Sequence, residues 1–355
     1  MSVNYPASRK AVVLDRLQHL ENVVLDVPPL HKNEVLLRVR SVGICGSDVN
    51  YYMNGGSTIA PVKYPHILGH EAAGDVLFVG DNVSDIHVGD RVALEPGYPC
   101  GKCSYCREGK YNLCEHISFM ATPIYVPYSE GAFVEYSLRP SFGFHKIPDS
   151  LSYNEAAMME PLAVALQAVE AGDTKMGMAA LILGCGPIAM CVLLSLRAAG
   201  VTNIYMIDIV AERTAFAAEL GATAVSQSLN SEFLQKIYDE TNGRGLDLVF
   251  DTTDCAPLVN QSIPAIRKGG KIVLIAVPHH DAISLDIVTL FKRQISVSTT
   301  FRYANQYPKA IRLVANGQIP IHRIITHSFG FDKADEAFQL AASRSGNVCK
   351  IVLNW

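Results

Sequence analysis

The sequence predicts an α/β protein with two domains, one rich in short β-strands and one built on a doubly wound parallel sheet. Three observations support this fold class. The 355 residues exceed the length at which a single core usually keeps growing, so two domains are expected. Hydrophobic residues make up 49% and charged residues 18%, which suits compact domains with large buried cores. The apolar pattern changes near Leu151, where short interrupted runs give way to longer ones.

The β-rich domain is expected over residues 1–158 and again over 298–355. Its apolar runs are short and are separated by Gly, Pro and Asp, as in VLLRVRSVGIC (35–45), AAGDVLFVG (72–80) and GDRVALEP (89–96). Such runs are typical of strands in a barrel or sandwich. The strand-like segment VCKIVLNW at the end of the chain is expected to return to this domain.

The parallel-sheet domain is expected over residues 159–297. A helix over SLSYNEAAMMEPLAVALQAVEAG (150–172) leads into it, with Ser and Asn as capping candidates. Apolar strands then alternate with helices, and the strands are AALILGCG (179–186), NIYMIDI (203–209), LDLVFDTT (246–253) and KIVLIAV (271–277). This alternation indicates a parallel sheet that is covered on both faces.

A glycine-rich turn joins the first of these strands to its helix and predicts a dinucleotide site. Gly184 permits the tight turn, and Gly186 lets the backbone approach a pyrophosphate. Pro187 and Ile188 open the helix, whose free N–H groups and positive dipole end face the phosphates. The small Ala189 allows the helix to pack closely on the strand.

An acidic residue supports this interpretation. Asp208 ends the next strand, about 20 residues after the turn, where a carboxylate can bind both hydroxyls of an adenine ribose. A carboxylate there would repel the 2′-phosphate of NADP, so NAD is favoured. Arg213, one helical turn past the strand, either stacks on the adenine or is a solvated helix residue, and both interpretations remain open.

Four cysteines in the fifteen residues CGKCSYCREGKYNLC, namely Cys100, Cys103, Cys106 and Cys114, predict a structural metal site. Four thiolates from one short loop can close a tetrahedral shell around zinc. A disulfide is a poor competitor, because residues three apart in a tight loop rarely reach disulfide geometry. The closed shell leaves no position for a substrate.

A second, mixed group predicts the working metal site. Cys45 follows a strand, and the pair His70 and Glu71 precedes another. Each residue alone is more often part of a core, but the thiolate cluster and the dinucleotide site favour the metal interpretation. Glu160 is a fourth candidate, although the helix dipole also explains a carboxylate at a helix start. Zinc with an open position can lower the pKa of a bound hydroxyl.

Other classes of protein are disfavoured. The formal net charge of −4 and the lack of a basic run argue against a nucleic-acid partner. The most apolar stretch, residues 179–199, is interrupted by Gly, Pro and Arg, so no membrane span is expected. The N-terminal residues lack a secretory pattern, and nine cysteines then suggest metal sites or free thiols in the cytoplasm. The cysteines outside the two metal groups are expected in the core: Cys185, Cys191, Cys255 and Cys349.

The segment GHEAAGDVLFVG (69–80) resembles the zinc alcohol dehydrogenase signature of the medium-chain dehydrogenase/reductase superfamily. Cys45, the four-cysteine loop, GCGPIA and EPLAVALQA stand in the order and spacing of that superfamily, over essentially the whole chain. More narrowly, the chain is similar to the sorbitol/xylitol (polyol) dehydrogenase branch in CGSDVNYY (45–52), ISFMATP (117–123), MEPLAV (159–164) and TTFRYANQYP (299–308).

The resemblance implies a GroES-like catalytic domain split around a Rossmann domain, assembled as a homotetramer. It implies NAD and two zinc ions in each chain. Cys45, His70 and Glu71 would surround the catalytic zinc, with Glu160 as a ligand or holding a zinc-bound water, and the four-cysteine loop would hold the structural zinc. Alcohol dehydrogenases carry a cysteine where this chain has Glu160, so Glu160 favours the polyol branch.

The resemblance also implies substrate and cofactor contacts. The substrate pocket would contain Ser47, Tyr51, Phe119, Thr122, Glu160, Arg302 and Tyr303. The cofactor contacts would include Ile188, Asp208 and Arg213, completed by Ile275, Ala276, Val277, Thr300, Phe301 and Arg302. From residue type alone, the Arg302–Tyr303 pair would be structural and Phe119 would be a core residue.

Three departures from the branch concern its pocket. Asn50 stands where many relatives carry a histidine linked to proton transfer, so that proton route does not carry over to this side chain. GGSTIAP (55–61) replaces a GRIG-like sequence, and ATPIYVPYSEGAF (121–133) is longer and more apolar than its counterpart. The particular polyol therefore does not follow from the resemblance.

The expected function is an NAD-dependent zinc polyol dehydrogenase that converts a secondary hydroxyl of a sugar alcohol to a ketose. The proton would leave through a zinc-bound water, Glu160 and Ser47. The alternatives are a zinc dehydrogenase of another secondary alcohol, of a diol such as butanediol, or of a hydroxy-amino acid of the threonine type. A non-catalytic zinc protein and an iron–sulfur carrier are weaker interpretations, because no catalytic ligand is missing and the cysteine spacing differs from the ferredoxin run.

Overall fold

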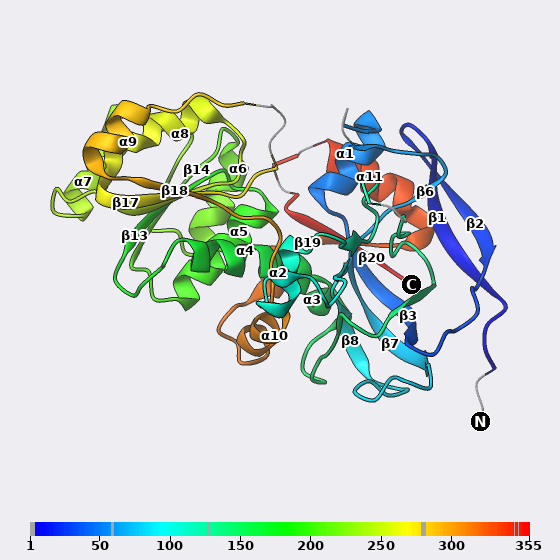
Figure 1. Cartoon of the computed structure of the whole chain (residues 1–355). Coiled ribbons are helices and arrows are strands. Elements are labelled where there is room, and N and C mark those ends of the chain that lie inside the picture. Colours follow the sequence, from blue (N-terminus) through cyan, green and yellow to red (C-terminus); the bar gives the residue numbers. More distant parts are fainter. Residues whose placement is uncertain (1–3, 58–59, 126–127, 278–281, 344, 347) are drawn as a thin grey trace. The chain divides into compact units, whose positions relative to one another are not determined.

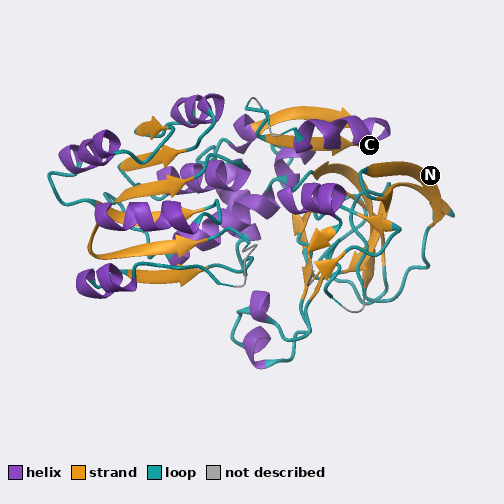
Figure 2. Cartoon of the chain, turned by 90° about the horizontal axis from the view of Figure 1, so that it is seen from above, coloured by secondary structure: helices purple, strands orange, loops and turns teal. Residues whose placement is uncertain are grey.

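The computed structural model describes residues 4–355 except 58–59, 126–127, 278–281, 344 and 347. The chain divides into two compact units, each with its own sheet (Figures 1 and 2). The first unit contains the residues up to Glu160, together with 307–316 and 325–355, and the second contains 161–306 and 317–324.

The first unit is built on a seven-stranded sheet. Its order is β12-β8-β7-β3-β20-β19, with β11 paired to β3, and only β19 and β20 run parallel. The strands are β3 (Glu34–Gly43), β7 (Glu71–Val79), β8 (Arg91–Leu94), β11 (Tyr136–Pro140), β12 (Phe144–Lys146), β19 (Ile325–Gly330) and β20 (Lys350–Asn354). Because β20 pairs with β3, the end of the chain returns to the first unit.

Smaller sheets complete this unit. A three-stranded sheet has the order β2-β1-β6, from β1 (Ser8–Arg16), β2 (His19–Asp26) and β6 (His66–Ile67). Two short pairs are β4 (Gly56–Ser57) with β5 (Ala60–Pro61), and β9 (Gly97–Tyr98) with β10 (Ser118–Phe119). Alternation along β3 directs Val35, Leu37 and Val39 into one core, where Phe133 and Phe338 also lie.

The helices of the first unit are α1 (Gly46–Asn54), α2 (Ser104–Arg107), α3 (Tyr153–Ala157), α10 (Tyr307–Ala315) and α11 (Ala334–Ala342), with 3₁₀ turns at Tyr111–Leu113 and Phe331–Lys333. The single helix expected over 150–172 is two helices, α3 and α4 (Met159–Ala171). Ser152 caps α3 by accepting a hydrogen bond from Glu155 N. Pro161 cannot continue α3, because its ring would clash with the carbonyl of residue 157.

The second unit is a parallel sheet with helices on both faces (Figure 1). Its strands are β13 (Ala179–Leu183), β14 (Asn203–Ile207), β15 (Ala224–Ser226), β16 (Leu246–Asp251), β17 (Ile266–Leu274) and β18 (Ser296–Thr299). The helices after α4 are α5 (Pro187–Ala198), α6 (Ala211–Glu219), α7 (Ser231–Glu240), α8 (Ala256–Ser262) and α9 (Ile287–Arg293), with 3₁₀ turns at Ile263–Ala265 and Ile321–Ile324.

The strand order of this sheet is β15-β14-β13-β16-β17-β18, and all neighbouring pairs are parallel. The chain therefore reverses its direction of progress between β13 and β16. In doubly wound sheets, ligands bind outside the carboxyl ends of the strands at such a switch point. The loops after β13, β14, β16 and β17 all reach that edge.

Two details differ from the expectations. The expected domain boundary between residues 297 and 298 falls inside β18, which pairs with β17 in the parallel sheet. Of the four cysteines expected in the core, Cys185 and Cys191 are buried, but Cys349 is half-buried and Cys255 is exposed. Cys255 precedes the first turn of α8 in a loop, so its apolar sequence neighbours do not bury it. Within the residues that the structure describes, no helix has the length and apolar character needed to cross a membrane.

Candidate active site

Cys45 lies at the junction of β3 and α1, in the N-cap position of the helix. Its N–H group donates a 3.0 Å hydrogen bond to the Oδ2 atom of Asp48, three residues into the helix. This bond satisfies one of the free N–H groups at the helix start. Cys45 is thereby held in an extended conformation, with its thiol at the end of the strand.

His70 and Glu71 stand at the start of β7, the neighbour of β3. Gly69 precedes them with φ of +90°, and a Cβ atom there would lie 2.6 Å from the ring of Phe133. Its N–H group donates a 3.1 Å hydrogen bond to Asp48 Oδ1, which also lies 3.7 Å from His70 Nδ1. The fully buried Asp48 carboxylate therefore connects the two segments that carry Cys45 and His70.

The ligand atoms of Cys45, His70 and Glu71 all lie within 4.8 Å of one another. The three residues that the sequence proposed as a group thus come together in the first unit. Burial would lower the pKa of His70, but the nearby charges of Cys45 and Asp48 raise it to about 10. The group therefore favours a bound positive charge. A thiolate, an imidazole and a carboxylate are ligands that zinc accepts, so the donor set fits zinc.

Lys350 is a member of this site that the sequence analysis missed. Its Nζ atom lies 2.6 Å from Glu71 Oε1 and 2.5 Å from Oε2, and both side chains are almost fully buried. Burial lowers the pKa of Lys350, but Glu71 and Cys45 hold it above its usual range. A Cβ atom at Gly43 would lie 2.0 Å from Glu71 Oε2, so the carboxylate needs a glycine there. No local pattern signals a partner 279 residues away.

Glu160 and Ser47 border this group. Glu160 is buried in the first turn of α4 and helps to raise the pKa of His70. It does not belong to the set of ligand atoms within 4.8 Å of one another. Ser47 is half-buried in the first turn of α1. On the same helix, Asn50 Oδ1 accepts a 2.8 Å hydrogen bond from Asn54 Nδ2.

The expected substrate contacts are distributed over both units. In the first unit, the ring of Phe119 lies 5.9 Å from the ring of His70, and Thr122 follows it in a turn. Tyr51 lies on α1, the helix that begins after Cys45. Arg302 and Tyr303 lie in the second unit. The sequence departures at 55–61 and 121–133 fall partly outside the described residues.

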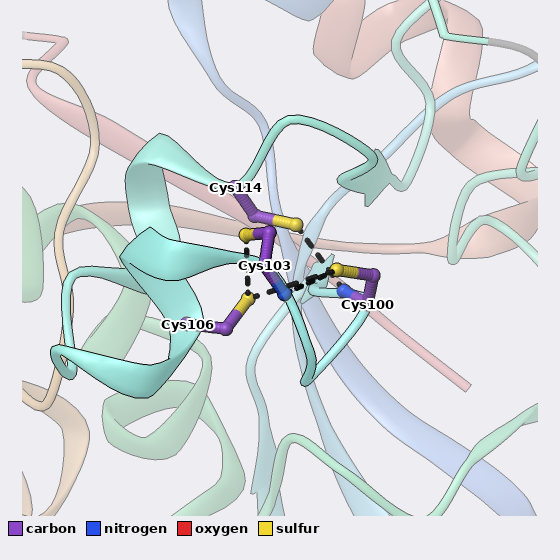
Figure 3. Close-up of side chains that lie close together, drawn as sticks. All are labelled: Cys100, Cys103, Cys106 and Cys114. Atoms are coloured by element: carbon purple, nitrogen blue, oxygen red, sulfur yellow. Dashed lines mark hydrogen bonds between the residues drawn. The ribbon is translucent and has the colours of Figure 1, made fainter.

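The four cysteines of the loop also come together (Figure 3). The sulfur atoms of Cys103 and Cys106 are 3.5 Å apart, and those of Cys100 and Cys106 are 4.0 Å apart. A tetrahedral zinc shell with Zn–S bonds of about 2.3 Å places its sulfurs about 3.8 Å apart, far beyond a disulfide bond. The four cysteines of the loop form no disulfide. The loop therefore has the geometry of a closed zinc site.

Backbone N–H groups in the loop donate hydrogen bonds to sulfur atoms and so stabilise thiolates. Cys100 N donates to Cys114 Sγ at 3.2 Å, and Cys103 N donates to Cys100 Sγ at 3.4 Å. N–H groups of Cys106 and Glu115 lower the pKa of Cys103 to about 6. Burial instead raises the pKa of Cys106 to about 12. The loop thus stabilises some thiolates by itself and leaves the rest to a cation.

A buried carboxylate attaches this loop to the first unit, and the sequence analysis did not identify it. Glu95 Oε1 accepts a 2.9 Å hydrogen bond from the hydroxyl of Tyr111, which lies in the loop. Glu95 Oε2 lies 2.8 Å from His145 Nε2 on β12. The ring of His145 stacks on Tyr307 at 4.8 Å. The loop is therefore held by polar bonds as well as by any metal.

In the second unit, the glycine-rich turn follows β13. Gly184 has φ of +95°, and a Cβ atom there would lie 2.7 Å from Thr252 Oγ1. Gly186 is the N-cap of α5, with Pro187 and Ile188 in its first turn, and the space around its Cβ position is open. A ligand can therefore approach the backbone and the free N–H groups of the helix.

Asp208 follows β14 beside this turn. Its Oδ2 atom accepts a 2.8 Å hydrogen bond from Cys185 N, and Oδ1 accepts a 3.0 Å bond from Val210 N. A carboxylate has about four acceptor positions, so capacity for ribose hydroxyls remains. Arg213 is half-buried on α6, the helix that follows.

The remaining expected cofactor residues lie after β17 and β18. Ile275 N and Ala276 N donate to Asp251 O at 2.9 and 3.3 Å, and Thr300 N donates to Leu274 O at 3.0 Å. These N–H groups are used within the fold. Val277 is exposed, and the guanidinium of Arg302 lies 4.9 Å from the centre of the ring of Phe301.

Comparison with known proteins identifies the family. Residues 31–149 match the family model of the alcohol dehydrogenase GroES-like domain, and residues 187–316 match that of the zinc-binding dehydrogenases. The chain is 35% identical to sorbitol dehydrogenase of Bacillus subtilis over 99% of both chains. It belongs to the zinc-dependent medium-chain dehydrogenases. D-xylulose reductase A of Aspergillus oryzae is also 35% identical, over 96% of this chain and 95% of its own.

Solved structures of the family share the fold. An Escherichia coli oxidoreductase/dehydrogenase of unknown specificity has a TM-score of 0.90 and 34% identity, covering 98% of this chain and 99% of its own. The 2R,3R-butanediol dehydrogenase of Bacillus subtilis has a TM-score of 0.88 and 29% identity, covering 98% and 99%. The comparisons confirm the GroES-like and Rossmann fold class and the resemblance to the polyol branch of the family.

Nicotinamide cofactors of both kinds occur among such structures. An Escherichia coli alcohol dehydrogenase with a TM-score of 0.88 and 26% identity, covering 99% of this chain and 100% of its own, is complexed with NADH. A putative zinc-binding dehydrogenase from Sinorhizobium meliloti with a TM-score of 0.88 and 27% identity, covering 99% and 100%, is bound to NADP. The choice between the two cofactors in this chain therefore depends on its own residues.

Proposed function

We propose that this protein is an NAD-dependent zinc polyol dehydrogenase. It oxidises a secondary hydroxyl of a linear sugar alcohol to a ketose and catalyses the reverse reaction. The observation that carries the proposal is the convergence of the half-buried Cys45 with the buried His70 and Glu71, whose donors and charge suit zinc, in a chain of a zinc-binding dehydrogenase family. The relatives named sorbitol dehydrogenase and D-xylulose reductase support a polyol as the substrate.

Cys45, His70 and Glu71 would hold the catalytic zinc, with Glu160 as a further ligand or holding a zinc-bound water. Zinc bound there would act as a Lewis acid that lowers the pKa of a substrate hydroxyl. Asp48 orients the site by accepting bonds from Cys45 N and Gly69 N. Lys350 balances the charge of Glu71, so the site carries less negative charge than its ligands alone suggest.

The substrate proton needs a route out of the site. We assign this role to Glu160 and Ser47, because Glu160 is a buried carboxylate in the electrostatic surroundings of His70. The amide of Asn50 cannot accept and release a proton as an imidazole does. Five further side chains would line the substrate pocket, namely Tyr51, Phe119, Thr122, Arg302 and Tyr303.

NAD would bind at the carboxyl edge of the parallel sheet and supply the hydride acceptor. Gly184, Gly186, Pro187 and Ile188 form the turn and helix start that suit its pyrophosphate. Asp208 would bind the adenine ribose, with Arg213 beside the adenine. Further contacts would come from Ile275, Ala276, Val277, Thr300, Phe301 and Arg302.

A second zinc is proposed for Cys100, Cys103, Cys106 and Cys114, whose sulfur separations support it. The family resemblance further suggests a homotetramer, and the cysteine usage suggests the cytoplasm. Elemental analysis of the purified protein, together with sedimentation, measures the zinc content and the number of chains.

The deciding experiment is an initial-rate screen with NAD. Its substrates are xylitol, sorbitol, galactitol, arabinitol, ribitol and 2,3-butanediol. A polyol dehydrogenase should prefer alcohols with several adjacent hydroxyls, with kcat/KM at least about tenfold above that for the diol. A higher kcat/KM for the simple diol than for every polyol would refute the proposal.

A diol dehydrogenase is the second candidate. The structural similarity to the 2R,3R-butanediol dehydrogenase favours it, as do the departures at residues 55–61 and 121–133. A hydroxy-amino acid of the threonine type is a third substrate to include in the same screen. These alternatives keep the metal and cofactor assignments and change only the substrate side of the site.

A further inference from the structure

One buried histidine lies outside the groups that bind metal or cofactor. His66 on β6 pairs with Leu14 of β1 and is only 2% exposed. Its Nε2 atom lies 3.2 Å from the carbonyl oxygen of Ala121, so Nε2 carries the hydrogen and donates it. Burial lowers the pKa of His66, which favours this neutral imidazole.

The carbonyl that His66 binds belongs to an unusual turn. Thr122 N donates to Phe119 O at 3.4 Å, which closes a turn over residues 119–122, and Ala121 N donates to Ser129 O at 2.9 Å. Ala121 has φ of +55°, in the left-handed region that residues with a Cβ atom disfavour. Such a conformation persists only where the surroundings hold it. The bond from His66 is one such restraint.

His66 also contacts a side chain of α1. The ring of Tyr51 on α1 meets its imidazole edge-on at 5.9 Å, and the ring of Tyr128 lies 5.1 Å away. The turn carries Phe119, whose ring lies 5.9 Å from the ring of His70. The imidazole of His66 thus contacts both Tyr51 and the turn that carries Phe119 and Thr122.

We propose that His66 is a positioning residue that determines substrate specificity by holding the turn of Phe119 to Thr122. The substrate part of this inference rests on the proposed function, because Tyr51, Phe119 and Thr122 are proposed substrate contacts. Displacing the turn removes contacts that a long polyol needs and a small diol does not. Loss of the His66 bond therefore shifts selectivity away from polyols.

The test separates the donated hydrogen bond from simple packing. His66→Phe fills the space without a donor, and His66→Gln retains a donor that can reach Ala121 O. Leu14→Val is the matched control, because Leu14 is the buried strand partner of His66 and makes no contact of this kind. Zinc content and KM for NAD of each variant show whether the metal and cofactor sites remain intact.

We expect His66→Phe to lower kcat/KM for xylitol by about tenfold or more, and that for 2,3-butanediol by less than about threefold. His66→Gln should restore most of the wild-type ratio of kcat/KM for xylitol to kcat/KM for 2,3-butanediol. Leu14→Val should lower Tm without changing the ratio. An equal loss on both alcohols in His66→Phe, or no rescue by His66→Gln, would overturn the proposal.

A second measurement does not depend on activity. Hydrogen exchange at the amides of Ala121 and Thr122 should be about tenfold faster in His66→Phe and unchanged in His66→Gln and Leu14→Val. Unchanged exchange in His66→Phe would overturn the positioning role. If the wild-type enzyme oxidises none of the screened sugar alcohols, the proposed function fails, and the exchange measurement alone decides the role of His66.

Discussion

At the scale of single residues, the carboxylate of Glu71 would bind both the proposed zinc and Lys350. Its ligand atom lies with those of Cys45 and His70, while Lys350 Nζ approaches both of its oxygens. A buried ammonium beside a buried carboxylate offsets the desolvation of both, but removing one partner leaves an uncompensated charge. Lys350 is therefore important for the folded state as well as for the metal site.

Replacement of Lys350 by Met should test this pair. We expect the free energy of unfolding to fall by about 3–5 kcal/mol, because the charge of Glu71 loses its partner inside the protein. The double variant with Glu71→Gln should lose less than the sum of the two single variants. Urea denaturation of all four proteins measures this coupling, and strict additivity would show that the pair contributes nothing specific.

Asp208 carries a second prediction at this scale. Asp208→Asn removes the charge and keeps one oxygen, which can accept one of the two backbone hydrogen bonds that the carboxylate accepts. The ratio of kcat/KM for NADP to that for NAD should rise by about tenfold, because the repulsion of the 2′-phosphate disappears. Initial rates with both cofactors measure the ratio. Equal efficiency with NADP and NAD in the wild-type protein would contradict the assignment of Asp208.

At the scale of elements, two features hold the cysteine loop in place: its four sulfur atoms and a hydrogen bond to a buried carboxylate. Its sulfurs converge (Figure 3), and the Tyr111 hydroxyl binds the buried Glu95 of the adjoining strand region. Because four thiolates would fill a tetrahedral zinc shell, we propose a structural role for the loop. The bond to Glu95 predicts that the loop keeps part of its position when a thiolate is lost.

Cys103→Ala should therefore reduce stability more than it changes chemistry. We expect a lower Tm, one zinc fewer per chain, and kcat within about threefold of wild type in the enzyme that remains folded. Thermal unfolding, elemental analysis and active-site titration provide these quantities. A large drop in kcat with unchanged Tm would instead place the loop in the reaction.

Elements also show what local patterns predict well. The strands over β3, β7 and β8 and the alternation from β13 to β17 agree with the sequence expectations to within a few residues. Apolar periodicity and turn residues are local, so they specify elements directly. The division of 150–172 into α3 and α4 was missed, although Pro161 signals it.

At the scale of the whole molecule, stability depends on buried groups that titrate. The pKa of His66 is lowered in the folded chain. In the unfolded chain the same imidazole has its ordinary pKa of about 6.5, so just below that pH the unfolded chain is protonated at this residue and the folded chain is not. The unfolded state then binds more protons, so stability rises with pH in this window. The contribution of His66 is present above pH 6.5 and is lost as the pH falls below it.

We therefore expect the free energy of unfolding to decrease between pH 7 and pH 5, and to decrease less in His66→Gln. Denaturation curves at several pH values give both slopes, and their difference isolates His66 from the other titrating groups. Identical slopes in the two proteins would show that His66 keeps its ordinary pKa in the fold.

From the sequence alone, chain length and apolar periodicity predicted the two-domain α/β class, and motif spacing predicted the four-cysteine loop and the turn from Gly184 with Asp208. Three interactions became visible only in the folded structure: the ion pair of Lys350 with Glu71, the hydrogen bonds from Cys45 N and Gly69 N to Asp48, and the hydrogen bond from His66 to Ala121 O. Most of these contacts join residues that are far apart in the chain and buried together. Their partners are selected by strand pairing and burial across the fold, which no local pattern encodes.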